Sequence, residues 1–252
     1  MAIGKMRSHT SDISYHSLPC GMRMVHVHSR GAATAIAGIT ARVGSRDDGP
    51  EAHGIAHMVE HNIFKGTERR SSWHIINRME AVGGELNAFT TKEETVVYSI
   101  YPAGNTARAA ELIADLVQNS QFPQRELDKE RQVIADEIDS YLDSPADAVY
   151  DDFDDLLFAG SSLGHNILGS KADIGKITSE QCRAYLRQHY TADNMVAFYS
   201  GPEAPARVLA TFATRFNPPQ SPSASTSTAA QPPHTPPFHV RRSIDSHQDH
   251  NI

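Results

Sequence analysis

The 252-residue chain has only two cysteines, Cys20 and Cys182, and no long run of apolar residues. Two cysteines so far apart supply neither a disulfide framework nor a cysteine-type zinc knuckle. Arg, His, Gly or Asp interrupts every apolar stretch well before the roughly 18 residues that a membrane-spanning helix needs. The first twelve residues also lack the apolar core of a signal peptide. We therefore expect no membrane span and a cytoplasmic location.

Basic residues are outnumbered as well, with 23 Lys and Arg against 30 Asp and Glu, which gives a net charge of −7. A nucleic-acid-binding protein should present a basic face, so we expect no nucleic-acid partner. Between Arg131 and Lys171 there is no Lys or Arg, whereas nine acidic residues fall within 136–155. Such a run is usually a solvated helix face. Beside a substrate cleft it would favour cationic peptides, and their cleavage would slow as salt is added.

The 39% of hydrophobic residues are enough for one packed domain or two small ones. Composition changes after Phe216, because residues 217–237 contain seven of the fourteen prolines and no charged side chain. This segment is typical of a semi-extended linker. We therefore expect one domain over residues 1–216, a Pro/Ser/Thr-rich linker over 217–237, and a tail over 238–252 that is too short to form a domain.

Periodicity within 1–216 predicts strands grouped with runs of consecutive helices. Alternation and β-branched residues predict strands at 13–18, 22–28, 33–43, 86–89, 95–101 and 195–199. Helical spacing predicts helices at 54–64, 73–82, 107–117, 124–142, 146–157, 178–189 and from about 202 to 216, with Gly83 and Gly84 as one helix stop. The expected class is α+β, a layered antiparallel or mixed sheet packed against helices.

The segment His57-Met58-Val59-Glu60-His61 is the sharpest local motif. On a helix, His57 and His61 project from one face about one turn apart and can bind one metal ion, with Glu60 beside them. The pattern H-x-x-E-H is the reverse of the zinc-protease motif H-E-x-x-H. The chain has 14 histidines, yet residue frequencies predict only roughly 0.04 accidental matches. His53, four residues earlier, is expected to be one more surface histidine.

Two histidines are one ligand short of the three protein ligands that catalytic zinc sites use. The predicted helix 124–142 carries Glu130 and Glu137, seven residues and about two turns apart on one face. Either glutamate alone would be an ordinary solvated side chain at the border of an apolar stripe. Together with the histidine motif they become candidate carboxylate ligands.

At this point the sequence resembles the pitrilysin/insulinase family of zinc metallopeptidases, which includes the mitochondrial processing peptidase. The resemblance covers about residues 12–216 and follows ordered blocks: GSRDD, HGIAHMVEHNIFKGT, VGGELNAFTTKEETVVY, ELDKERQVIADEI, SPADAVYDDFDDLLF, GHNILGS and NMVAFYSG. Several blocks in the right order make the match specific to the zinc-bearing N-terminal half of such peptidases, including their bacterial members.

The resemblance implies that His57, His61 and Glu137 bind Zn2+ and that Glu60 is the general base. It also implies that Glu130 is a carboxylate just outside the ligand sphere. Family members bind substrate in extended form along a strand that matches GGELNAFTT, so Asn87 and Ala88 would border the cleft. From the residues alone, an ordinary interior strand is an equally good interpretation of that segment.

Typical family chains contain two related halves around a chamber, whereas only the zinc-bearing half is present here, followed by a tail over 238–252 that resembles the start of the second half. The resemblance therefore implies a partner: a second half-domain or a separate subunit, in a heterodimer or a homodimer. A natural half-size subunit and a shortened product are both open interpretations.

The function that the resemblance implies is that of a zinc-dependent metalloendopeptidase, or a catalytic half of one, acting on peptides or unfolded segments. One alternative is a non-catalytic binding or assembly subunit. Another is a small metal hydrolase or lyase similar to S-ribosylhomocysteinase, in which a cysteine is the third ligand. Cys182 lies inside a predicted helix with no glycine-flanked loop, which disfavours that last hypothesis.

Overall fold

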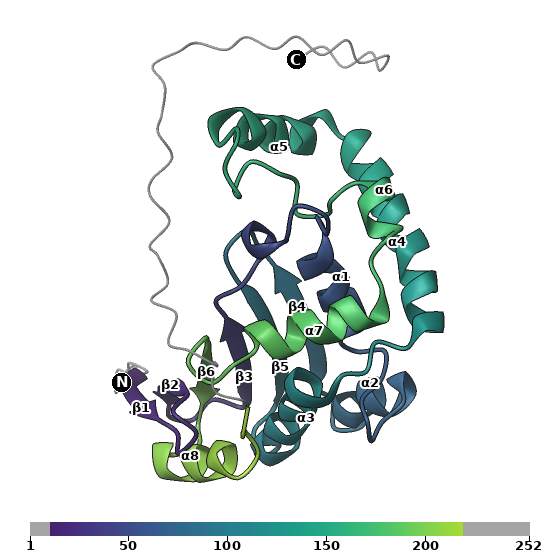
Figure 1. Cartoon of the computed structure of the whole chain (residues 1–252). Coiled ribbons are helices and arrows are strands. Elements are labelled where there is room, and N and C mark those ends of the chain that lie inside the picture. The colour runs from purple at the N-terminus through teal and green to yellow at the C-terminus, as the bar shows by residue number, and fades with distance from the viewer. Residues whose placement is uncertain (1–10, 219–252) are drawn as a thin grey trace, which may run out of the picture.

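The structure, a computed structural model, describes residues 11–218 and is built around one six-stranded mixed sheet (Figure 1). The strands are β1 (Ser11–Ser17), β2 (Arg23–Ser29), β3 (Thr34–Ala41), β4 (Glu85–Thr90), β5 (Thr95–Pro102) and β6 (Met195–Gly201). They follow the order β1-β2-β6-β3-β5-β4 across the sheet. β2 and β6 pair in parallel, and the other neighbouring pairs are antiparallel.

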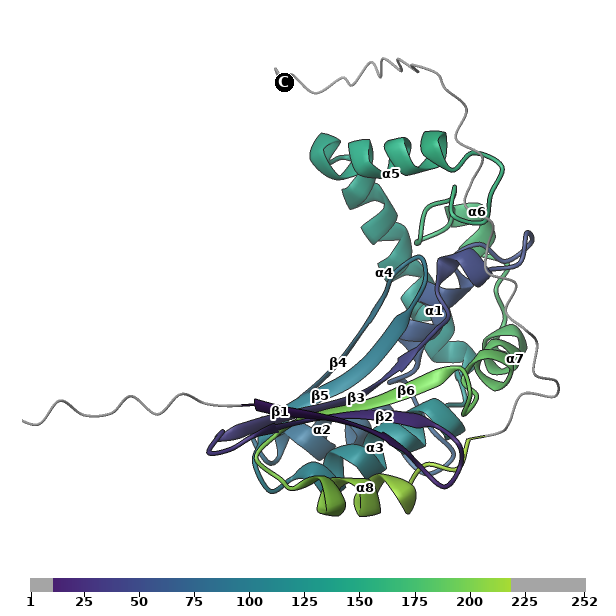
Figure 2. The same cartoon turned by 90° about the vertical axis from the view of Figure 1, so that its left-hand side faces the viewer.

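The helices gather on one face of the sheet and beyond its β4 edge. They are the short 3-10 helix η1 (Ser45–Asp47), α1 (Ile55–Asn62), α2 (Ser72–Glu80), α3 (Thr106–Asn119), α4 (Gln124–Leu142), α5 (Pro145–Leu157), α6 (Lys171–Ile174), α7 (Ser179–His189) and α8 (Pro205–Ala213). Figure 2 shows α2, α3 and α8 beneath the sheet, while α5 crosses the far end of α4. A mixed sheet layered against helices confirms the predicted α+β class.

Alternation along the strands separates a buried face from an exposed apolar face. On β3, Ala35, Ala37 and Ile39 are at most 3% exposed on the side where α3 packs. The strand register aligns the side chains of the other face in rows across the sheet. We call this opposite surface the open face; it includes Ile13, Tyr15, Val25, Phe198, Tyr98, Ile100 and Phe89. On the open face, Tyr15 is 78% exposed within the described part of the chain. Monomeric soluble proteins rarely expose large continuous apolar surfaces.

Most predicted elements are present within a few residues of their expected bounds. Gly83 ends α2 as predicted, with a φ of 72° and a hydrogen bond from its N–H to the carbonyl of Glu80. The sequence did not predict η1 or α6, which are three and four residues long. Apart from Asn217 and Pro218, the predicted linker 217–237 and the tail 238–252 lie outside the described residues. Across residues 11–218, no helix combines the length and apolarity needed to cross a bilayer.

Candidate metal centre

The helix that carries the H-x-x-E-H motif is α1, and its first turn is held by a buried carboxylate. The backbone N–H groups of Gly54 and Ala56 donate to Asp48, at 2.7 and 3.1 Å. A carboxylate here satisfies N–H groups that have no partner within the helix and complements the helix dipole. Met58 and Val59 then point into the core with no exposed surface. This anchoring fixes the direction in which the remaining side chains of α1 project.

His57 and His61 project together toward α4, as their spacing predicts. Their ring centroids are 4.5 Å apart. The Nε2 atoms of His57 and His61 lie 3.8 and 3.5 Å from one oxygen, Oε2 of Glu137. Ligands about 2.1 Å from a tetrahedral zinc ion are about 3.4 Å apart, so the three atoms are close to the spacing that zinc requires. This group could therefore hold a metal ion.

His57 is in the neutral state that a metal requires, and His61 is oriented by a carboxylate. Burial, together with the neighbouring His61, lowers the pKa of His57 to about 3, so its ring is neutral near pH 7. On the other side of His61, Nδ1 donates to Oε2 of Glu130 at 3.1 Å. That bond leaves the lone pair of Nε2 facing Glu137, the arrangement that metal-binding histidines usually have.

Glu130 is itself held by a lysine that the sequence did not single out. The ammonium group of Lys65 lies 2.7 Å from Oε1 of Glu130, so one carboxylate bridges Lys65 and His61. Lys65 follows α1, whereas Glu130 belongs to α4, and no local spacing connects the two. Only the packing of α1 against α4 brings them together.

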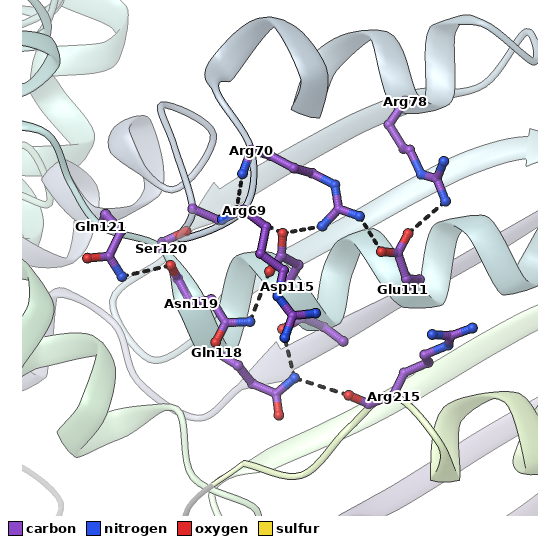
Figure 3. Close-up of polar contacts among 12 residues, drawn as sticks. Arg69, Arg70, Arg78, Glu111, Asp115, Gln118, Asn119, Ser120, Gln121 and Arg215 are labelled. Carbon is purple, nitrogen blue, oxygen red and sulfur yellow. Dashed lines mark hydrogen bonds and ion pairs between the residues drawn. The ribbon is translucent and has the colours of Figure 1, made fainter.

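The loop that carries Lys65 is fixed by a polar network on α3. The hydroxyl of Thr67 donates to Asp115 at 2.8 Å. Figure 3 shows Arg70 between Asp115 and Glu111, with Arg78 of α2 on the other side of Glu111. Because these partners are largely buried, the loop after α1 has a defined path. The network therefore helps to position Lys65, the partner of Glu130.

Glu60 lies beside the same group, at the wall of a cavity of about 260 Å³. Burial raises the pKa of Glu60, while a hydrogen bond with Thr90 of β4 opposes that shift. A carboxyl group of raised pKa in a cavity next to possible metal ligands is a suitable proton acceptor. The cavity is lined by His57, Glu60, Phe89, Thr90, Glu137, Tyr141, Asp151, Asn166, Ile167 and Leu168.

The segment predicted to bind substrate is an edge strand, and not an interior one. β4 ends the sheet and pairs with β5 alone among the described strands. The backbone N–H of Ala88 donates to the side chain of Asn87 at 2.8 Å. Both residues precede the cavity-lining Phe89 and Thr90 on the same strand. The free edge of β4 thus leads directly to the candidate metal centre.

Some aspartates of the acidic run 136–155 form ion pairs with lysines, and one lines the cavity. Asp139 pairs with Lys171, and Asp154 with Lys92 at 2.9 Å. Asp151 lines the cavity and accepts a hydrogen bond from Asn166 at 2.5 Å. Burial raises the pKa of Asp151, with nearby aspartates adding to the shift. Of the run, Asp151 and the ligand candidate Glu137 are the carboxylates that face this cavity.

Two curated proteins are similar to this chain over 185 residues, each at 36% identity. One is a probable mitochondrial-processing peptidase subunit beta from Arabidopsis thaliana; the match covers 73% of this chain and 35% of that protein. The other is an uncharacterised zinc protease from Streptomyces coelicolor, with 73% and 40% covered. The chain thus spans well under half the length of these relatives.

The fold is also that of a solved domain. The crystal structure of a peptidase M16 inactive domain from Pseudomonas fluorescens matches with a TM-score of 0.77 at 18% identity, over 84% of this chain and 52% of that one. The model of the insulinase family, peptidase family M16, matches residues 23–171. This match covers more than half of the chain and includes the whole of α1 and α4. The chain therefore belongs to the insulinase family of peptidases, family M16.

Proposed function

We propose that this chain is the zinc-binding half of a metalloendopeptidase and that His57, His61 and Glu137 bind the ion. The observation that carries the proposal is the approach of two imidazole nitrogens to one carboxylate oxygen, at 3.8 and 3.5 Å, beside a cavity. The name of the Streptomyces coelicolor relative, a zinc protease, supports zinc. A zinc ion bound there would supply Lewis-acid chemistry toward a peptide carbonyl and a water molecule.

The chain's own groups would carry the proton. Glu60 accepts a proton from the attacking water and returns it to the leaving amine, which a carboxyl of raised pKa does better than an ordinary glutamate. Glu130 keeps the ring of His61 oriented through Nδ1 and remains outside the ligand set. The hydrogen bond with Thr90 couples Glu60 to the strand along which substrate would lie.

The substrate would be an extended peptide or unfolded segment that adds to the free edge of β4. Main-chain hydrogen bonds beside Asn87 and Ala88 would hold it, and the strand direction would carry the scissile bond past Phe89 toward Glu60. Asp151 in the cavity would favour a cationic side chain near the scissile bond. Asp139 and Asp154 already form ion pairs with lysines, so fewer carboxylates would attract a cationic substrate than the sequence contains.

A second half-domain or partner subunit would complete the enzyme, in a heterodimer or a homodimer. The chain's share of its relatives' length supports this, since 35% and 40% leave room for another half. The exposed apolar side chains of the open face, such as Tyr15 at 78% and Ile13 at 60%, also suit a surface that another domain shields. Residues 1–216 would then be one half-domain, followed by the linker 217–237.

The test is the Glu60→Gln variant, with Glu80→Gln at the exposed end of α2 as the control. Quenched peptides are assayed with the chain alone and with a second half-domain added, with and without chelator. We expect chelator-sensitive cleavage by the parent chain or the mixture, full activity in Glu80→Gln, and zinc retained without cleavage in Glu60→Gln. Cleavage by Glu60→Gln at the parent rate would contradict the general-base role.

A non-catalytic binding or assembly subunit is the second candidate. One observation favours it: the solved domain with this fold from Pseudomonas fluorescens is described as inactive. Under this hypothesis the parent chain binds peptides or a partner, and neither the chain nor the mixture cleaves any peptide of the library. The presence of Glu60 between the two histidines argues for catalysis.

A further inference from the structure

A second group of possible metal ligands lies at the N-terminal end of α1, where Asp48 is hydrogen-bonded to the first turn. Asp48 follows η1, His53 precedes α1, and His165 belongs to the loop between α5 and α6. Their ligand atoms all lie within 4.8 Å of one another. The two imidazole rings are 4.3 Å apart with an interplanar angle of 54°, close to the 4.5 Å and 60° of His57 and His61.

Asp48 is the most buried member of this group, and its side chain has no exposed surface. A buried carboxylate is stable only when its charge is compensated by hydrogen bonds, a cationic group or a metal. Within residues 11–218, no Lys or Arg forms an ion pair with Asp48; the nearest basic nitrogen is Nε2 of His165, at 3.9 Å. The two backbone N–H donors of α1 supply dipoles but no net charge.

His53 presents an unsatisfied ring nitrogen, and the ring of His165 is oriented by a backbone carbonyl. Nδ1 of His53 is buried and has no hydrogen-bond partner within the described part of the chain. Leaving such an atom unsatisfied is unfavourable, and a metal ion would remove that cost. His165 donates from Nε2 to the backbone carbonyl of Ser45 at 2.7 Å. Histidines that bind metals commonly donate their other ring N–H to a carbonyl in this way, and in the neutral ring the lone pair is then on Nδ1 of His165.

We propose that Asp48, His53 and His165 form a second site for a divalent transition-metal ion, with Zn2+ the best fit to two nitrogens and one oxygen. This site is separate from the one formed by His57, His61 and Glu137, and it goes beyond the proposed peptidase activity. Its role is structural, because it joins the chain before α1 to the loop that contains Leu168.

The backbone contacts around the site support that role. A Cβ atom at Gly54 would lie 2.5 Å from the carbonyl oxygen of Leu168, and one at Gly169 would lie 2.5 Å from that of His53. The two segments are therefore packed backbone to backbone. Leu168 and the nearby Asn166 line the cavity that also contains His57 and Glu60. A metal ion at Asp48 would thus hold one wall of that cavity against the helix that carries His57.

The test is the zinc stoichiometry of the full chain, measured by elemental analysis and native mass spectrometry after dialysis against zinc. The variants are His57→Ala, His165→Ala, the double variant, and His74→Ala as a surface control. We expect two ions per chain in the parent and the control, one in each site variant and none in the double variant. Circular dichroism verifies that each variant is folded.

His53→Gln is a second variant that tests the same site if His165→Ala does not fold, because His53 is partly exposed. A parent chain that binds one ion, lost in His57→Ala and retained in His165→Ala and His53→Gln, would overturn the second site. An ion count that His57→Ala leaves unchanged and His165→Ala lowers would instead overturn the catalytic zinc ligands. The two proposals thus fail with different results.

Discussion

Replacing Glu130 with Gln should weaken zinc binding at the centre formed by His57, His61 and Glu137. One carboxylate bridges Nδ1 of His61 at 3.1 Å and the ammonium group of Lys65 at 2.7 Å. An amide of the same shape can still accept from Nδ1, but a neutral hydrogen bond is about half as strong as a charge-assisted one.

The expected loss can be worked out from this bridge. A hydrogen bond to a charged group contributes about 1.5–3 kcal/mol and a neutral one about 0.5–1.5 kcal/mol, so the substitution removes about 1–1.5 kcal/mol. That corresponds to roughly tenfold weaker zinc binding, the lower end of the range for groups that orient a metal ligand. Lys65 loses its carboxylate but is 26% exposed, so it can turn toward solvent and the fold should survive.

The assay is competition for zinc between the protein and a chromophoric chelator, carried out in the His165→Ala background so that one site is titrated. Glu126→Gln is the matched control, because Glu126 also lies on α4 and pairs with a lysine, Lys129, at 2.7 Å. We expect the control to bind zinc as tightly as the background protein. Equal affinities for Glu130→Gln and Glu126→Gln would refute the reasoning.

Three further predictions concern stability and substrate charge. His57 has a pKa of about 3 in the folded, zinc-free chain and about 6.5 in the unfolded chain, so the folded state loses stability as pH falls below 6.5. Urea unfolding should show a loss of about 1.4 kcal/mol between pH 7.5 and 5.5, and the His57→Gln variant should lack it. An equal pH dependence in both proteins would contradict this prediction. Gly54 has φ at 87°, and a Cβ there would lie 2.5 Å from a carbonyl oxygen, so Gly54→Ala should lower the free energy of unfolding by at least about 2 kcal/mol. Gly31 has a similar φ of 81° but open space around it, so Gly31→Ala should lower it by only about 1 kcal/mol. Similar losses in the two variants would show that the close contact at Gly54 is relieved easily. Salt should raise the KM for cationic peptides in the parent protein and much less in Asp151→Asn, and an identical salt dependence would remove Asp151 from substrate selection.

Local periodicity was enough to predict most of the elements and to single out the two histidines with Glu130 and Glu137, whereas the choice of Glu137 as the third ligand came from the family resemblance. The separation of four residues places His57 and His61 on one face because a helix has 3.6 residues per turn, and the structure brings their rings to 4.5 Å. The predicted helix 124–142 has the bounds of α4, which brings Glu137 to the histidines. Periodicity and glycine conformation depend on a few neighbouring residues, so both can be predicted from the sequence without knowledge of the fold.

Long-range pairing could not be predicted in the same way. β6 lies between β2 and β3, although the first three strands are consecutive in the sequence, because no local pattern encodes which distant strand pairs with which. His165 bonds to Ser45 across 120 residues, and His53, expected as one more surface histidine, lies against His165. Lys65 was missed for the same reason, since its partner Glu130 lies on a different helix.

The central claim is that zinc binds between α1 and α4. The most direct measurement is an anomalous difference map, collected on both sides of the zinc absorption edge, from crystals of the full chain grown with zinc. The proposal predicts a peak about 2.0–2.2 Å from Nε2 of His57, Nε2 of His61 and Oε2 of Glu137. Zinc-saturated crystals with no peak at that position would contradict it.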